Sequence, residues 1–243
     1  MHNSHFFQDS FDEGTHTKLT LLEKYVRAWI PTFIHTNRIK EIQMFDPFCG
    51  PGTTEKGDKG SPLIVLREAV RYARKYSSSA RPPIRLFFSD SKLKELEQLQ
   101  TNPEIENAKK YIDVRITHMN FRDLFEKSRH SRKDPSIAAF FFIDQFGVKE
   151  LSCDIFFDLV NSPRTDWLAF MSSSTARRFL KEECFKSIPQ ANFGALKDCH
   201  RELTEAYRQL ANNPEYFILP FSIKKGTNIY GLIFGYRSPT RCG

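Results

Sequence analysis

The chain has 243 residues, of which 40% are hydrophobic, and carries a formal net charge of +7. This length and apolar content suit one sizeable α/β domain with its own core and exclude a disordered chain. The sequence also lacks a signal peptide and any apolar stretch near the roughly 20 residues of a membrane helix, which predicts a cytoplasmic protein without a membrane partner.

The five cysteines are odd in number and form no C-x-x-C pair, so the sequence predicts neither a disulfide framework nor a metal site. A reducing setting fits this pattern. The basic charge, in turn, suits an acidic partner such as nucleic acid.

The chain divides into an N-terminal helical segment, residues 1–38, and a core, residues 39–243, within a single domain. Leu19, Leu22 and Val26 recur at helical spacing and predict a helix over residues 17–34. Ser61 is the expected N-cap of a later helix, with Pro62 in its first turn. Strands are predicted where short apolar runs end at polar or turn residues, over residues 39–45, 84–89, 111–119, 138–143, 167–171, 216–223 and 229–236. Helices are predicted between them over residues 62–76, 92–100, 121–128, 151–161, 175–185 and 195–212.

Strands that alternate with helices predict a mostly parallel sheet, and the last two strands predict an antiparallel pair at its edge. Together with the N-terminal helix, this pattern is typical of the methyltransferase variant of the doubly wound, Rossmann-like α/β fold. The expected sheet has seven strands.

A glycine-rich segment, DPFCGPG at residues 46–52, follows the first predicted strand. Glycines at such a turn let backbone approach a ligand at the carboxyl ends of the strands. The segment is neither a P-loop nor G-x-G-x-x-G, so a dinucleotide is disfavoured. A tight turn without a ligand is the plainer alternative. Cys49 within it is expected to be a small buried hydrophobe rather than a nucleophile.

This segment resembles the D-P-F-x-G-x-G motif of S-adenosylmethionine-dependent methyltransferases, particularly those that act on exocyclic amino groups of nucleic-acid bases. The resemblance implies that Asp46 lies near the methionine amino group of the cofactor. It also implies that Gly50 and Gly52 leave room for the backbone-like part of that group, with Phe48 in the same cofactor site.

Polar residues also end the second and third predicted strands. Asp90 can accept hydrogen bonds from both ribose hydroxyls of a cofactor, as the corresponding acid does in dinucleotide folds, or it can be a solvated helix cap. In methyltransferases the end of the third strand often offers a polar group to the adenine amine and an apolar contact to its ring. This implies cofactor roles for Asn120 and Phe121, although Asn120 can equally cap the next helix, and Asp123 can compete for its role.

The fourth strand is fully apolar and ends in IDQFG at residues 143–147. Amino methyltransferases of bases carry an acidic or amide residue, two prolines and an aromatic at this place. This chain has the acidic residue, Asp144, and the aromatic, Phe146, but Gln145 replaces one proline and Gly147 follows. We expect Asp144 to accept a hydrogen bond from the substrate and Phe146 to stack on a flipped base. The alternative is that Asp144 binds only the cofactor or a helix end.

Several segments together resemble the three-Cys-motif partner protein family. They are HTKL at 16–19, DPFCGPG at 46–52, GSPL at 60–63, IDQFG at 143–147 and YGLIF at 230–234. The resemblance covers most of the chain and implies a class I methyltransferase fold and a partner protein with three cysteines. His16 and Lys18 can cover the cofactor pocket as a lid or simply start a helix.

Three basic groups lie along the chain, and each can also be an ordinary solvated face. The group formed by Arg177, Arg178 and Lys181 follows the fifth strand and is the candidate for substrate phosphate contacts. Another group surrounds the loop after residue 76, with members at Arg71, Arg74, Lys75, Arg81 and Arg85.

The sequence thus predicts an S-adenosylmethionine-dependent methyltransferase that acts on nucleic acid or a nucleotide-like substrate together with a partner protein. The alternative is a catalytically silent methyltransferase-like module that senses an adenosyl ligand or nucleic acid for that partner. Gln145 and Gly147 favour the alternative slightly.

Overall fold

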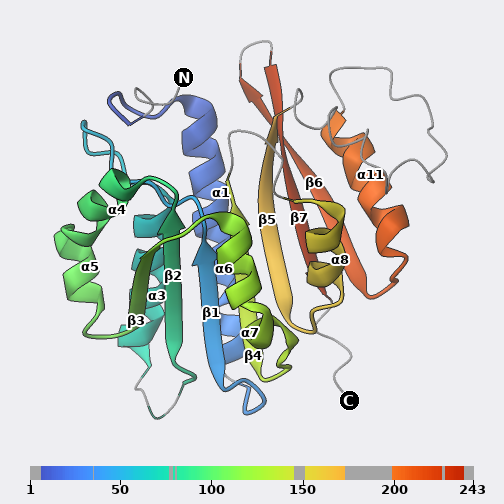
Figure 1. The fold of residues 1–243 in the computed structure, drawn as a ribbon, viewed down its shortest axis with the longest axis horizontal. Helices are drawn as coiled ribbons and strands as arrows, with labels where there is room; N and C mark the ends of the chain where they lie inside the picture. The colour runs from blue at the N-terminus through green and yellow to red at the C-terminus, as the bar shows by residue number, and fades with distance from the viewer. Residues whose placement is uncertain are drawn as a thin grey trace. The chain divides into compact units, whose positions relative to one another are not determined.

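The structure is a computed structural model that describes residues 7–34, 36–76, 79, 81–144, 151–172, 199–225 and 228–237. Its strands are β1 (Glu41–Asp46), β2 (Ile84–Asp90), β3 (Asp113–His118), β4 (Ile137–Ile143), β5 (Thr165–Ser172), β6 (Tyr216–Lys225) and β7 (Asn228–Arg237). They form a seven-stranded sheet in the order β3-β2-β1-β4-β5-β7-β6 (Figure 1). β1, β2 and β3 pair in parallel, whereas β7 is antiparallel to both of its neighbours. The predicted Rossmann-like, methyltransferase-type fold is confirmed.

The described helices are α1 (Glu13–Trp29), α2 (Pro31–Ile34), α3 (Ser61–Lys75), α4 (Leu93–Gln100), α5 (Pro103–Ala108), α6 (Phe121–Lys127), α7 (Arg129–Lys133), α8 (Cys153–Val160) and α11 (Cys199–Ala211). Within the described residues, no helix has the length and apolar character needed to cross a membrane. Tertiary contacts divide the chain into two compact units, Met1–Phe140 and Phe141–Gly243. The single-domain organisation therefore stays a prediction.

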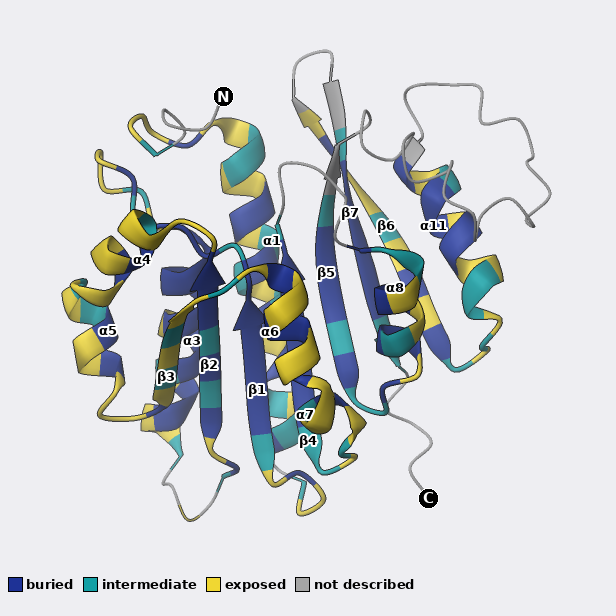
Figure 2. Cartoon of the chain, viewed as in Figure 1, coloured by how far each residue is buried: buried dark blue, intermediate teal, exposed yellow. Residues whose placement is uncertain are grey.

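In the first unit, helices cover both faces of the parallel strands. α1 and α3 lie on one face and α6 and α7 on the other (Figure 1). β1 and β2 are buried along much of their length, and in β1 only the first residue is not buried, whereas the edge strand β3 has no buried residue (Figure 2). Leu22 and Val26 of α1 are fully buried, and the ring of Trp29 packs on Phe140 with centroids 5.7 Å apart. The amphipathic pattern read from the sequence thus anchors α1 to the core.

The second unit has an aromatic core between α8, β5 and α11. Phe156, Trp167 and Tyr207 contact one another, and the indole N–H of Trp167 donates to the hydroxyl of Tyr216 over 2.8 Å. A Cβ at Gly235 of β7 would overlap the indole, so the strand admits only glycine at this contact. Cys153, the first residue of α8, is disulfide-bonded, so the expectation of no disulfide is wrong for this residue.

Several predicted boundaries differ from the structure. The helix expected over residues 17–34 starts earlier, at Glu13, because the Asp12 carboxylate accepts a hydrogen bond from the Thr15 N–H over 2.9 Å. It also ends at Trp29, before the short helix α2. Ser61 does not cap α3, because Gly60 is the N-cap and Ser61 is the first helical residue. The helices α5 and α7 were not predicted, and the helix expected over residues 175–185 lies outside the described residues.

Candidate functional site

The parallel pairing of the first unit brings the carboxyl ends of three strands to one edge of the sheet. Asp46, the last residue of β1, is opposite Phe88, and Asp90, the last residue of β2, is opposite His118 of β3. Open α/β sheets bind ligands at this edge because the loops that leave the strands converge there. The predicted cofactor residues from β1, β2 and β3 all lie at this edge.

The glycine-rich segment forms a closed turn at the end of β1. Gly50 and Gly52 have φ values of 58° and 84°, a left-handed conformation that strongly favours glycine. The N–H of Gly60 donates to the carbonyl of Gly52 over 2.7 Å, which closes the loop just before α3 begins. The Cys49 N–H donates to the carbonyl of Ser89 over 3.1 Å and so fastens the turn to β2.

Asp90 holds the glycine turn with its side chain. One carboxylate oxygen accepts a hydrogen bond from the Gly50 N–H over 3.1 Å, and the other accepts one from the Lys92 N–H over 3.0 Å. The residue is only 9% exposed, so the alternative of a solvated cap is wrong. A carboxylate has about four acceptor positions, and these two bonds leave about two for a ligand. That number matches the two hydroxyls of a ribose.

Asp46 and Cys49 are both buried in the turn. Oδ1 of Asp46 accepts a hydrogen bond from the Phe48 N–H over 3.3 Å, which orients the carboxylate toward the turn's own backbone. Burial raises the pKa of the Cys49 thiol well above its ordinary value, and the carboxylates of Asp46 and Asp90 raise it further. Because the thiolate is the reactive form, Cys49 is an inert packing group, in agreement with the sequence.

The end of β3 contributes one capping residue and one apolar ring. Asn120 caps α6: its side-chain oxygen accepts from the Asp123 N–H over 2.9 Å, and its amide donates to the Asp123 carboxylate over 2.8 Å. The capping alternative for Asn120 is thereby confirmed. Phe121 is buried and packs on Phe48 of the glycine turn, with ring centroids 5.8 Å apart. Phe48 is only half-buried, so its ring is the apolar surface that the glycine turn presents, and the buried ring of Phe121 supports it.

The structure adds an N-terminal residue that the sequence did not reveal. The ring of Phe7 lies on Gly50, where an added Cβ would come within 2.6 Å of its Cζ atom. The Phe7 carbonyl accepts from the Glu55 N–H over 2.8 Å, and the Phe11 N–H donates to the Asp58 carboxylate over 2.7 Å. Residues 7–11 thus form an N-terminal strap, bound to the loop that follows the glycine turn. The sequence signal that could have indicated this strap is the pair of aromatic residues, Phe7 and Phe11, that precede the first helix.

Ser89 is a second residue that sequence reasoning missed. It precedes Asp90 in β2 and is fully buried, yet its hydroxyl makes no hydrogen bond within the part of the chain that the structure describes. A buried hydroxyl without such a bond is costly, and sites of this kind often serve a function. It lies in the strand that carries the ribose-type acid.

The predicted catalytic and substrate residues are placed only in part. Asp144 directly follows β4 and is half-buried, in the second unit. Phe146 lies outside the described residues. The same holds for the predicted phosphate contacts Arg177, Arg178 and Lys181.

Comparison with known proteins gave matches among solved structures only. A scan against protein-family models found no match, and neither did a search of curated proteins. An O-methyltransferase from Bacillus cereus in complex with SAH is 13% identical, with 94% of this chain and 83% of that chain covered and a TM-score of 0.48. The O-methyltransferase TomG from Streptomyces achromogenes in complex with SAM is 10% identical, with coverages of 98% and 100% and a TM-score of 0.48. Trm1 from Pyrococcus horikoshii with S-adenosyl-L-methionine is 12% identical, with coverages of 94% and 57% and a TM-score of 0.47. Family and activity therefore rest on the residues of the chain itself.

Proposed function

We propose that this chain is an S-adenosylmethionine-dependent methyltransferase that acts on nucleic acid or a nucleotide-like substrate together with a partner protein. The observation that carries the proposal is the hydrogen bond from the Gly50 N–H to the Asp90 carboxylate, 3.1 Å long. It holds a glycine turn and a ribose-type acid together at the carboxyl edge of a methyltransferase-type sheet. Membership of the three-Cys-motif partner family, and the partner itself, are supported by the sequence motifs.

The side chains at this edge fit an adenosyl ligand. Asp90 keeps about two acceptor positions for ribose hydroxyls, and the half-buried ring of Phe48, supported by Phe121, offers an apolar contact for adenine. The cofactor would supply an electrophilic methyl group. Methyl transfer is an in-line displacement, so the task of the protein is to align donor and acceptor and to stabilise the developing charge.

Asp144 is the group of this chain that we assign to the acceptor. It ends the apolar strand β4 and is half-buried, so its carboxylate is shielded in part from water. There it would accept the hydrogen bond of a substrate amine or hydroxyl and orient the lone pair that attacks. Phe146 would stack on the base, and Arg177, Arg178 and Lys181 would contact phosphates.

A binding module is the second candidate function, and the position of Phe7 favours it. Its ring lies on Gly50, at the close approach that the cofactor would need. In this alternative the chain holds an adenosyl ligand or nucleic acid while the partner performs the chemistry; because the ring would obstruct an adenosyl ligand as well, it favours the form that holds nucleic acid.

Calorimetry and a methyl-transfer assay together test the proposal. The protein should bind S-adenosylhomocysteine, and labelled S-adenosylmethionine should yield a methylated product and S-adenosylhomocysteine when nucleic acid is present. Binding without product formation would support the module instead. No heat of binding and no thermal shift at millimolar ligand would contradict the methyltransferase and any module that holds an adenosyl ligand.

A matched pair of variants locates the ligand. Asp90→Asn should weaken binding about tenfold or more, because a charge-assisted hydrogen bond to ribose is lost. Asp134→Asn is the control, since Asp134 also accepts two local hydrogen bonds, from the N–H and the hydroxyl of Ser136, but precedes β4 at the opposite edge. Its affinity should equal that of the wild type.

A further inference from the structure

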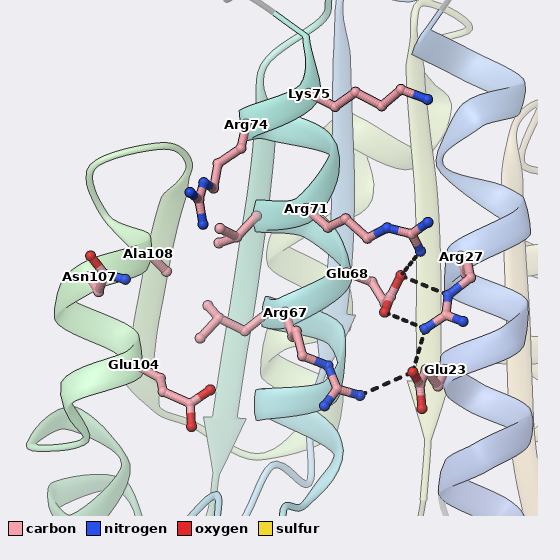
Figure 3. Close-up of a pocket in the computed structure, with 12 residues that line it drawn as sticks. Glu23, Arg27, Arg67, Glu68, Arg71, Arg74, Lys75, Glu104, Asn107 and Ala108 are labelled. Carbon is pink, nitrogen blue, oxygen red and sulfur yellow. Dashed lines mark hydrogen bonds and ion pairs between the residues drawn. The ribbon is translucent and has the colours of Figure 1, made fainter.

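A groove of about 920 Å³ lies along α3 in the first unit, between α1 and α5 (Figure 3). Five basic side chains line it: Arg27, Arg67, Arg71, Arg74 and Lys75. The groove lies along the outer surface of α3, and none of the predicted cofactor residues lines it. It therefore calls for an explanation of its own.

A buried carboxylate fixes the floor of the groove. Glu68 of α3 is 1% exposed, and it accepts hydrogen bonds from Arg27 at 2.8 and 3.1 Å and from Arg71 at 3.2 Å. Burial raises the pKa of Glu68, but the two guanidinium groups outweigh this effect and hold that pKa below its ordinary value. Glu68 therefore stays ionised at neutral pH and orients two arginines. Arg27 also donates to Glu23, and among the described residues the other N–H groups of the two guanidinium groups have no carboxylate partner, which leaves them for an anion.

The acidic residues of the groove leave two of its cations unneutralised. Glu23 pairs with Arg27 and with Arg67, and the third carboxylate, Glu104, pairs with Lys59. Among the residues that the structure describes, no carboxylate lies within ion-pair distance of Arg74 or Lys75. These two residues end α3 and make its last turn strongly positive.

Tyrosine rings accompany both of these cations. The guanidinium of Arg74 lies 5.7 Å from the ring centroid of Tyr111, and the ammonium of Lys75 lies 5.3 Å from that of Tyr76. Tyr111 is 38% exposed and lies beside the groove, next to Arg74, rather than among the residues that line it. Cations interleaved with exposed aromatic rings are typical of single-stranded nucleic-acid sites.

The spacing of the cations suits a polymer of anions. Arg67, Arg71 and Lys75 follow one another at intervals of four residues, and α3 rises about 6 Å over each interval. They therefore form a row about 12 Å long on one side of the helix. A single phosphate would contact only one or two members of such a row.

We propose that this α3 groove binds a segment of single-stranded nucleic acid, with phosphates along Arg67, Arg71 and Lys75 and a base against Tyr111. The aromatic ring distinguishes this ligand from an acidic peptide, which has no bases to stack. The proposal adds a second contact region to the nucleic-acid substrate proposed above. It is tested without the cofactor, so its failure and the failure of the methyltransferase assignment are distinguishable.

Fluorescence anisotropy with a labelled oligonucleotide of about 16 nucleotides tests the proposal, over salt concentrations from about 50 to 200 mM. Arg74→Ala combined with Lys75→Ala should weaken binding about tenfold or more at low salt. Each phosphate contact contributes about 0.7 to the slope of log affinity against log salt, and Lys75 is the one proposed phosphate contact of this pair, so the double variant should lower that slope by about 0.7.

Two matched variants make the result specific. Lys94→Ala combined with Lys127→Ala removes the same charge from exposed positions outside the groove and should leave the slope unchanged. Tyr111→Ala should weaken binding about 5- to 150-fold, whereas Tyr111→Phe, which keeps the ring, should bind as the wild type does. Thermal unfolding checks that each variant is folded.

Several outcomes would overturn the proposal. Equal losses in the groove variant and the control variant would show a diffuse charge effect. Full binding in Tyr111→Ala would remove the stacking contact, and equal competition by polyglutamate would identify an acidic peptide as the ligand. Absence of any binding by the wild type would also reject it.

Discussion

Replacement of Phe7 by alanine is the sharpest perturbation of the candidate cofactor site. The ring lies on Gly50, and a ligand that approaches this glycine closely has to displace it. Full burial of a Phe side chain is worth about 1.5–3 kcal/mol, so the half-buried ring of Phe7 contributes about 0.75–1.5 kcal/mol to the closed strap. That energy opposes binding, and its removal should tighten the affinity for S-adenosylhomocysteine about four- to twelvefold.

Calorimetric titration of the wild type and Phe7→Ala measures this effect directly. The substitution leaves the backbone bond from Glu55 to the Phe7 carbonyl in place, so that only the ring is tested. Lys56→Ala is a control that cuts the exposed ion pair between the strap and the loop, at Asp9, and it should leave the affinity unchanged. Weaker binding in Phe7→Ala would refute the reasoning, because it would show that the ring contacts and stabilises the bound ligand.

Three further variants test the turn, the groove and the acceptor. Gly52→Ala should destabilise the fold by about 1–3 kcal/mol, because residue 52 has a left-handed backbone. The loss should exceed that of Gly57→Ala, since an added Cβ at residue 52 would lie 2.7 Å from Leu99 whereas one at residue 57 would meet nothing within 4 Å. Urea unfolding measures both losses. Burial raises the pKa of Glu68, but the guanidinium groups of Arg27 and Arg71 bring this pKa below its ordinary value. The ion pairs of Glu68 therefore stabilise the fold above about pH 4, and this stabilisation is lost as the pH falls further. The pH dependence of unfolding should be shallower below about pH 4 in Glu68→Gln. Asp144→Asn should keep cofactor affinity and lose single-turnover methyl transfer, because an amide is the weaker acceptor; full activity would remove this residue from the mechanism.

The sheet could be predicted because each strand is indicated by the residues of its own segment. The apolar run of β4 and the polar residues that end β1, β2 and β3 are visible without any knowledge of their neighbours. The short helices were missed for different reasons. α5 has a start signal in Asn102 and Pro103 but almost no apolar periodicity, whereas α7 is nearly all basic and depends on its packing.

The positions of the candidate site residues could be predicted, but not their contacts. Asp46 and Asp90 end their strands and Asn120 follows β3, so they come to one edge, because parallel strands present their last residues there; their cofactor roles stay predictions. The hydrogen bond between Asp90 and Gly50 joins residues far apart in the sequence, and so does the contact of Phe7 with Gly50. Local patterns carry no information on such pairs. The capping of α6 by Asn120 is the one contact that sequence spacing alone indicated.

Asp90 has one observed task, at the turn, and one proposed task, at the ribose, and the two have to be separated before any of its variants can be interpreted. Its carboxylate holds the Gly50 N–H, so its loss disturbs the turn even when no ligand is bound. A change at this position therefore lowers ligand affinity in two ways, through the shape of the turn and through the ribose contact. Unfolding measurements on the free protein report the first effect alone, because no ligand is present. If Asp90→Asn lowers affinity far more than its effect on stability accounts for, the remainder belongs to the ribose. If the two losses are equal in free energy, Asp90 only shapes the turn, and the ribose assignment is wrong.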